Sequence, residues 1–109
     1  MSDENLLTKE DIISMLSELY LESVLKELIE TDYSSSDYFL VELRLNCEDP
    51  HVLIGVEDFE TMEFDEYSYS IDEFKEIFEK AADIKIKKYP ERKNDIETAY
   101  KILLNKLNV

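Results

Sequence analysis

The sequence predicts a small α+β domain with one helix, then three antiparallel strands, then two helices. Two observations carry this prediction. Apolar residues recur every three or four positions at both ends of the chain, whereas they alternate with polar residues in the middle. The chain has 109 residues, which is the size of one domain, so residues 1–109 are expected to share a single core.

The first helix is expected from about Lys9 to Glu30. Thr8 and Asp11 have the spacing of a capping box, with Asp in the place of the usual Glu. A segment rich in Ser and Asp, residues 31–37, ends this helix because these side chains compete for backbone hydrogen bonds. Its apolar positions are Ile12, Ile13, Leu16, Leu19, Tyr20, Val24, Leu25, Leu28 and Ile29, and Leu21 widens this stripe beyond one face.

Three strands are expected between residues 39 and 70. Apolar residues alternate over Phe39–Leu45, a turn follows at residues 46–50, and His51–Val56 is rich in β-branched residues. The first two strands are close enough to form a hairpin. A third strand is expected over Thr61–Ser70. The apolar residues of its first half are out of phase with the tyrosines of its second half, which predicts a bulge or a bend near Asp65 and Glu66.

Two helices are expected after the strands. Ser70 and Glu73 form a capping box at the start of the first of them. Pro90 separates it from the last helix, because proline cannot continue a helix. Their apolar faces consist of Phe74, Ile77, Phe78, Ala81 and Ala82, and of Ile96, Ala99, Tyr100, Leu103 and Leu107.

The composition excludes several classes of function. Acidic residues number 27 and basic residues 12, which gives a net charge of −15. Such a chain repels nucleic acid and anionic membranes, so a macromolecular partner is expected to be a basic protein. One glycine argues against a Gly-rich phosphate loop, and one cysteine excludes a disulfide framework. The start of the chain is acidic and no long apolar run follows, which favours a cytoplasmic protein with Cys47 reduced.

The charge is unevenly distributed along the chain. Residues 1–84 contain 24 acidic and 5 basic residues, whereas residues 85–109 contain 3 acidic and 7 basic residues. Residues 48–79 contain twelve carboxylates and one basic residue, Lys75. The simpler interpretation is a solvated acidic surface with no binding role. The basic residues of the last segment are expected to pair within the molecule or to face solvent, and a second binding patch stays open as the alternative.

The alternative interpretation is a docking surface for a cationic protein. Clustered carboxylates repel one another, and a cationic partner relieves this repulsion by neutralising them. Phe59 or Phe64 is expected to be buried, so tyrosines would provide the aromatic contacts. Carboxylates spaced like phosphates could also mimic nucleic acid. The expected partner-binding residues are Glu57, Asp58, Glu60, Glu63, Asp65, Glu66, Tyr67, Tyr69, Glu73 and Glu76.

No motif predicts catalysis, a metal site or a cofactor. Cys47 and His51 lie four residues apart around a turn, which gives no sign of a nucleophile held against its base. His51 has no second imidazole to share a metal ion. The segment Asp58–Glu63 lacks the central glycine of a calcium loop, and no phosphate-loop or hydrolase motif occurs. The chain is therefore not expected to be an enzyme.

In size, charge and element order the chain resembles two groups of inhibitor proteins. These are the bacterial immunity proteins that neutralise nuclease toxins, and the phage proteins that block host nucleases, including anti-CRISPR proteins and DNA mimics. The resemblance implies a non-catalytic inhibitor of a basic nucleic-acid-processing enzyme. It includes no motif, so it assigns no residue and does not separate toxin immunity from phage counter-defence.

Two other functions stay open. A small adaptor or subunit could bind its partner through the apolar face of the first helix, with Leu21 and Leu25 in the contact. A small enzyme could use an acidic cleft. The sequence does not indicate whether the protein is a monomer or a dimer.

Overall fold

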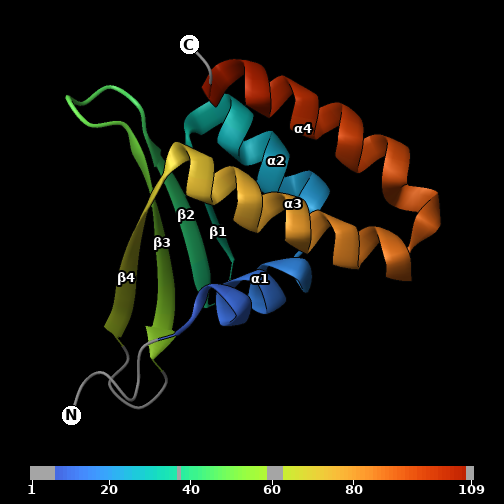
Figure 1. Cartoon of the computed structure of the whole chain (residues 1–109), viewed down its shortest axis with the longest axis horizontal. Coiled ribbons are helices and arrows are strands. Elements are labelled where there is room, and N and C mark those ends of the chain that lie inside the picture. Colours follow the sequence, from blue (N-terminus) through green and yellow to red (C-terminus); the bar gives the residue numbers. More distant parts are fainter. Residues whose placement is uncertain (1–6, 37, 59–62, 108–109) are drawn as a thin grey trace.

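A computed structural model describes residues 7–36, 38–58 and 63–107. The fold is α+β, as predicted, with a four-stranded antiparallel sheet and helices on one of its faces (Figure 1). In chain order the elements are α1 (Lys9–Ser17), α2 (Leu21–Thr31), β1 (Tyr33–Ser36), β2 (Phe39–Arg44), β3 (His51–Asp58), β4 (Glu63–Ser70), α3 (Ile71–Lys88), the 3-10 turn η2 (Pro90–Arg92) and α4 (Lys93–Leu107).

The sheet is a simple meander in which each strand pairs with the next, so β1 and β4 are its edges. Alternation places Phe39, Val41 and Leu43 of β2 on the covered face, where all three are buried. The helices α1, α2 and α3 pack against this side, and α4 lies on the outside of α2 (Figure 1). The predicted hairpin of the first two long strands is confirmed.

The first helix differs from the prediction, because it is broken into α1 and α2 at residues 18–20. On one straight helix Leu16 and Leu21 would lie about 140° apart, so both could not face one core. The break turns the second segment, and both side chains are 0% exposed. Leu25 is also fully buried, so the apolar face considered for an adaptor is part of the core. The capping box of Thr8 and Asp11 is present as predicted.

The prediction of three strands was also wrong by one strand, since β1 forms where only the end of a helix was expected. Asp32 ends α2 in the left-handed conformation, with φ 64°, and the chain turns directly into β1. Ser34 is buried and its hydroxyl donates to Glu27 Oε1 at 2.6 Å. A short polar edge strand has no apolar alternation by which the sequence could predict it. β1 is a strand because its backbone pairs with β2.

The expected bulge in the third strand is absent from the described residues. The register of β3 with β4 runs without interruption from His51 opposite Ser70 to Asp58 opposite Glu63. Residues 61 and 62, which were expected to begin this strand, lie outside the described residues. The change in apolar phase therefore reflects a change of face: Phe64 lies on the uncovered face and the tyrosines on the covered one.

The carboxyl-terminal helices form as predicted. Ser70 and Glu73 make a complete capping box at the start of α3, and Pro90 opens the turn that leads into α4. Phe78 of α3 stacks on Tyr100 of α4 with ring centroids 5.2 Å apart. Within the described residues, no helix combines the length and the apolar character needed to cross a membrane.

Candidate interaction surface

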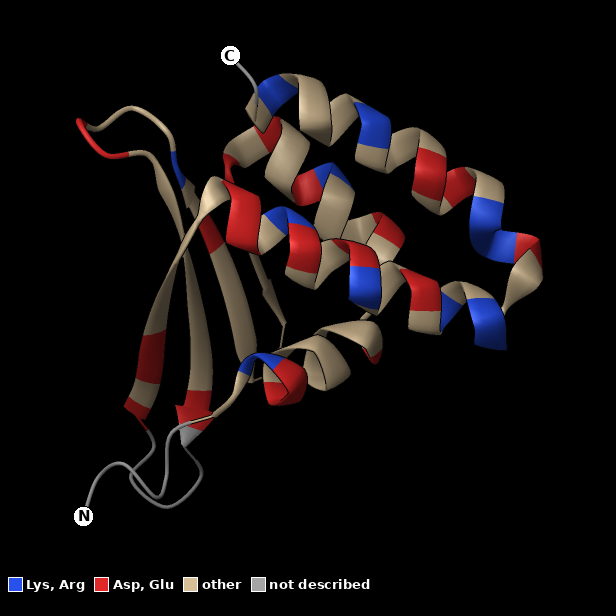
Figure 2. Ribbon diagram, in the orientation of Figure 1, with Lys and Arg blue, Asp and Glu red and all other residues tan. Residues whose placement is uncertain are grey.

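The carboxylates with the greatest exposure on the sheet lie on β4, at the end near residues 59–62 (Figure 2). Glu63, Asp65 and Glu66 are exposed. Because successive strand residues point to opposite faces, this group is divided between both sides of the sheet. Glu63 and Asp65 lie on the helix-covered side and Glu66 lies on the uncovered side. We call these three residues the β4 acidic group.

The predicted tyrosines point toward the helices. Tyr67 and Tyr69 pair with Ile54 and Val52 of β3, which are fully buried, and both rings pack partly buried against the core. The hydroxyl of Tyr67 accepts a hydrogen bond from the backbone N–H of Leu7 at 3.1 Å. Burial raises the pKa of Tyr69. Both side chains therefore have a structural role and offer only part of their surface to a partner.

The sequence interpretation assigned the aromatic contacts mainly to the tyrosines, but the structure exposes Phe64. Phe64 is 40% exposed on the uncovered face. Phe59 lies outside the described residues, so the expectation that one of these two residues is buried stays a prediction. Glu57 of β3 is directly opposite Phe64, and Glu66 follows two residues along the same face. Alternation through β4 would have placed Phe64 and Glu66 on one face from the sequence alone, whereas the position of Glu57 opposite Phe64 depends on the strand register.

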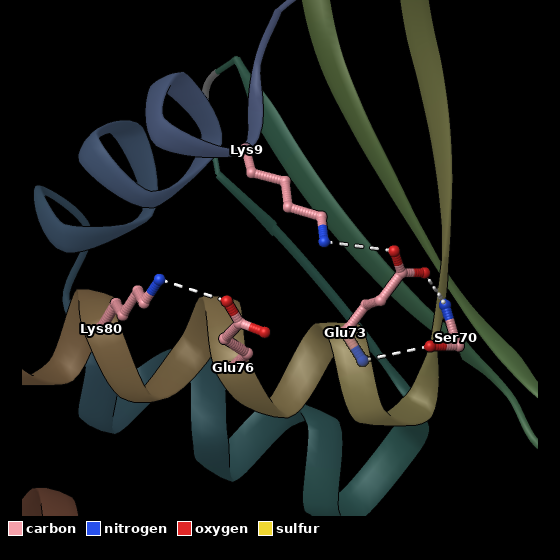
Figure 3. A network of polar contacts seen from close by, with 5 residues as sticks. All are labelled: Lys9, Ser70, Glu73, Glu76 and Lys80. Carbon is pink, nitrogen blue, oxygen red and sulfur yellow. Dashed lines mark hydrogen bonds and ion pairs between the residues drawn. The ribbon is translucent and has the colours of Figure 1, made fainter.

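The carboxylate of Glu73 is engaged within the fold (Figure 3). Its Oε1 accepts the backbone N–H of Ser70 at 3.0 Å, and its Oε2 lies 3.2 Å from Lys9 Nζ. The hydrogen bond from the Ser70 backbone, followed by that from Lys9, lowers the pKa of Glu73. The same contact raises the pKa of Lys9. Glu73 thereby joins the start of α3 to the start of α1.

Further along α3 the carboxylates also have partners. Glu76 Oε1 lies 3.1 Å from Lys80 Nζ, one turn later on the same helix (Figure 3). Glu79 Oε2 accepts the hydroxyl of Tyr100 at 2.9 Å. Burial, together with this hydrogen bond, raises the pKa of Tyr100. The structure thus separates Glu73 and Glu76 from the β4 acidic group in environment, although the sequence placed them in one set.

Two of the predicted residues are incompletely described. Asp58 ends β3 opposite Glu63, and only its backbone position is described. Glu60 lies outside the described residues. Glu57 is half-buried on the uncovered face. The candidate surface that the structure supports therefore consists of the β4 acidic group, Phe64 and Glu57.

The basic end of the chain is used partly inside the molecule, as the sequence predicted. Arg92 of η2 donates hydrogen bonds to both carboxylate oxygens of Glu22 at the start of α2, with Nε 2.8 Å from Oε2. Its guanidinium also lies over the ring of Tyr20, 4.3 Å from the centroid. The hydrogen bond from Arg92 lowers the pKa of Glu22. Figure 2 shows that Lys and Arg lie mainly on α3, on α4 and at the turn between them, and that β4 carries none.

Lys106 makes a second internal contact of this kind. Its ammonium group donates to the carbonyl oxygens of Leu28 and Ile29, at 2.8 and 2.7 Å, and pairs with Asp32. Both carbonyls belong to the last turn of α2, where that of Leu28 also accepts the backbone N–H of Asp32 at 3.1 Å. A cation is favourable there because the carboxyl end of a helix carries partial negative charge. Lys106 thereby attaches α4 to α2.

Cys47 and His51 lie close together at the β2–β3 turn, where they line a hollow of about 530 Å³. The sulfur is 3.9 Å from His51 Nδ1, but this nitrogen is 2.8 Å from the carbonyl oxygen of Asp49. A carbonyl oxygen can only accept, so Nδ1 carries the proton in this arrangement and cannot take one from the thiol. The sulfur itself lies 3.3 Å from the carbonyl oxygens of Arg44 and Asp49.

Metal-binding side chains are also scattered. Among the residues that the structure describes, no group of three or more His, Cys, Asp or Glu side chains converges closely enough to hold a metal ion.

No model of a known protein family, no curated protein and no solved structure matches this chain.

Proposed function

We propose that this chain is a non-catalytic inhibitor that binds a basic nucleic-acid-processing enzyme, a nuclease, in the cytoplasm and blocks it. The observation that supports this proposal most is the exposed β4 acidic group on the edge of the sheet. Within the described residues, the side chains of Asp65 and Glu66 make no ion pair or hydrogen bond. Clustered carboxylates of this kind attract cationic proteins and accelerate their association.

A nuclease is the class of partner favoured by this chemistry. The channel of such an enzyme is lined with Lys and Arg, which attract a carboxylate at long range much as they attract a phosphate. The net charge of −15 repels nucleic acid itself, so the chain would compete with the substrate and would not bind it. An anti-CRISPR protein or DNA mimic and a toxin-immunity protein would both act in this way. The genes next to the one that encodes this chain would distinguish the two roles, because a toxin gene indicates immunity and a phage setting indicates counter-defence.

The test combines capture with an activity assay. The tagged protein is incubated with its native lysate at low salt and at about 0.15 M salt, and retained proteins are identified by mass spectrometry. We expect one dominant basic nuclease at the higher salt, and we expect the purified protein to abolish its activity at a one-to-one ratio without turnover. Many weakly held basic proteins, all lost as salt rises, would contradict the proposal.

A charge-matched pair of variants locates the contact. The first variant carries Glu63→Lys, Asp65→Lys and Glu66→Lys. The control carries the same change of charge at exposed helical positions, with Lys in place of Glu30, Glu91 and Glu97. We expect the first variant to lose inhibition and the control to retain it. Equal loss in both would show that only net charge matters and that β4 is not the docking site.

A further inference from the structure

The outer edge of β4 offers a row of backbone hydrogen-bonding groups. β4 is the last strand of the sheet, and within the described residues it pairs only with β3. In an antiparallel strand about half of the N–H and C=O groups point to each side, so one set faces away from β3. The strand has eight residues, whereas the opposite edge strand β1 has four and lies against α2.

We infer that β4 is a docking edge that accepts an extended cationic segment of the partner as a fifth strand. The inference rests on the proposed function, from which it takes a basic partner, and adds how that partner is held. Backbone hydrogen bonds would give the affinity and the side chains beside β4 the specificity. An added strand would place its side chains next to those of β4, on both faces of the sheet.

The distribution of charge on β4 specifies where the partner needs its cations. Glu63, Asp65 and Glu66 occupy the first half of the strand, while Ser68 and Ser70 occupy the second half. Lys or Arg are therefore required at the end of the partner segment that lies beside the first half. Small or hydroxyl side chains fit beside the second half. If the added strand is antiparallel to β4, as every neighbouring pair in this sheet is, it carries its cations in its second half.

Phe64 gives the same end of β4 an anchor for a cation. Its ring is exposed on the uncovered face, between Glu57 across the sheet and Glu66 along the strand. A guanidinium or ammonium group over such a ring gains a cation–π interaction, and the carboxylates beside it neutralise its charge. The arrangement favours a cationic partner over an apolar one.

A second copy of this chain fits the edge poorly. Each copy would bring the same β4 acidic group and the same net charge of −15, so like charges oppose the approach of two β4 edges. Charged residues on an edge strand commonly prevent such pairing. The carboxylates would thus exclude self-association while attracting a strand of opposite charge.

The experiment uses the full chain and three synthetic peptides of the same length as β4. All three share one sequence, with Thr and Val in the first half and Lys and Arg alternating with Thr in the second, because a strand antiparallel to β4 meets Glu63, Asp65 and Glu66 with its second half. The first peptide is unmodified. The second carries backbone N-methyl groups at alternate residues, which leaves one edge able to pair. The third carries them at consecutive residues, which blocks both edges. Charge and side chains are identical in the three peptides.

Binding is measured by titration calorimetry at about 0.15 M salt, and the amides of β4 are followed by hydrogen exchange. We expect the first two peptides to bind and to protect β4 amides. The third should bind at least about 10-fold more weakly, because it cannot make the backbone hydrogen bonds. Equal binding of all three peptides, or protection confined to the helices, would overturn the inference.

Two variants complete the design. Asp65→Lys with Glu66→Lys should abolish binding of the first peptide, whereas Glu91→Lys with Glu97→Lys, which has the same net charge, should retain it. A concentration-dependent dimer of the unmodified protein with β4 amides already protected would identify a second copy as the occupant and overturn the inference. Capture of a nuclease without protection of β4 would reject only this binding mode. Protection of β4 by the peptide with no nuclease retained would reject only the proposed function.

Discussion

Strand β4 and the helical layer both carry many carboxylates, but the fold uses them differently. In the helices Glu73 completes a capping box and pairs with Lys9, while Glu22 is gripped by Arg92. On β4 the side chains of Asp65 and Glu66 extend into solvent and contact no other described side chain as an ion pair. A run of acidic residues therefore contains two populations, one that stabilises the fold and one that does not.

This difference follows from local geometry. A helix brings positions three and four apart onto one face, so an acidic residue in it meets a cation or a capping site within a turn. An edge strand has a neighbouring strand on one side only, so its exposed carboxylates have fewer side chains of the same chain within reach. Within the described residues, the carboxylates we expect to be available to a partner are thus those of Asp65 and Glu66.

The largest expected effect is on binding, and it comes from β4. Replacing Asp65 and Glu66 by Lys should reduce affinity for the captured partner by about 100-fold at low salt, mainly through the association rate. Thermal stability should not fall, because these carboxylates repel their acidic neighbours. Surface plasmon resonance and calorimetric unfolding measure the two quantities. A large loss of stability with unchanged affinity would contradict this account, because Asp65 and Glu66 would then stabilise the fold and not bind the partner.

In the helical layer, Glu22→Gln should reduce the free energy of unfolding by about 1–2 kcal/mol, because it removes the charge from a pair with two hydrogen bonds. Arg92 lowers the pKa of Glu22 below its ordinary value of 4.5. This stabilisation is therefore complete above about pH 4.5 and is lost as pH falls through the lowered pKa.

Denaturant unfolding at several pH values tests this dependence. The variant should show a weaker loss of stability in acid than the unmodified protein. Arg92→Ala should weaken this loss of stability in acid to a similar degree, because the substitution removes the same ion pair. If both variants lost stability in acid as steeply as the unmodified protein, the pair would not account for the acid sensitivity.

A smaller effect is expected where β4 meets α3. Ser70→Ala removes the hydroxyl that accepts the N–H of Glu73 at 3.1 Å, which should cost about 1 kcal/mol of stability. The variant leaves the charge of the molecule unchanged, so partner affinity at fixed salt should stay the same. Thermal unfolding and binding measured on the same sample separate the two roles, and a fall in affinity would show that the Ser70 hydroxyl itself takes part in the contact.

The smallest effect is expected at Glu76. Its pair with Lys80 is exposed and joins positions four apart on α3, so Glu76→Gln should cost at most about 0.5 kcal/mol. Glu76 was expected from the sequence to contact the partner, whereas its ion pair places it with the helical carboxylates. A clear loss of partner affinity in this variant would return Glu76 to the docking surface.

Much of the fold could be predicted from local patterns, since capping boxes and periodicity depend on neighbouring residues. The break after Ser17 was indicated only by Leu21, which widened the apolar stripe, and its interpretation needed the position of the core. β1 has no apolar alternation and exists because β2 pairs with it. At the candidate surface, the acidic run was visible in the sequence. The exposure of Phe64 depends on which face of the sheet the helices cover, and no local pattern determines that.

The most direct test of this account is the salt dependence of the association rate with the captured partner. It compares the unmodified protein, the variant with Asp65→Lys and Glu66→Lys, and a variant with the same change of charge at Glu73 and Glu76. The account predicts that reversal on β4 slows association and flattens its salt dependence, while reversal on α3 lowers stability and has a much smaller effect on association. Equal slopes for the two variants would contradict the account, because the partner would then respond only to the net charge of the chain.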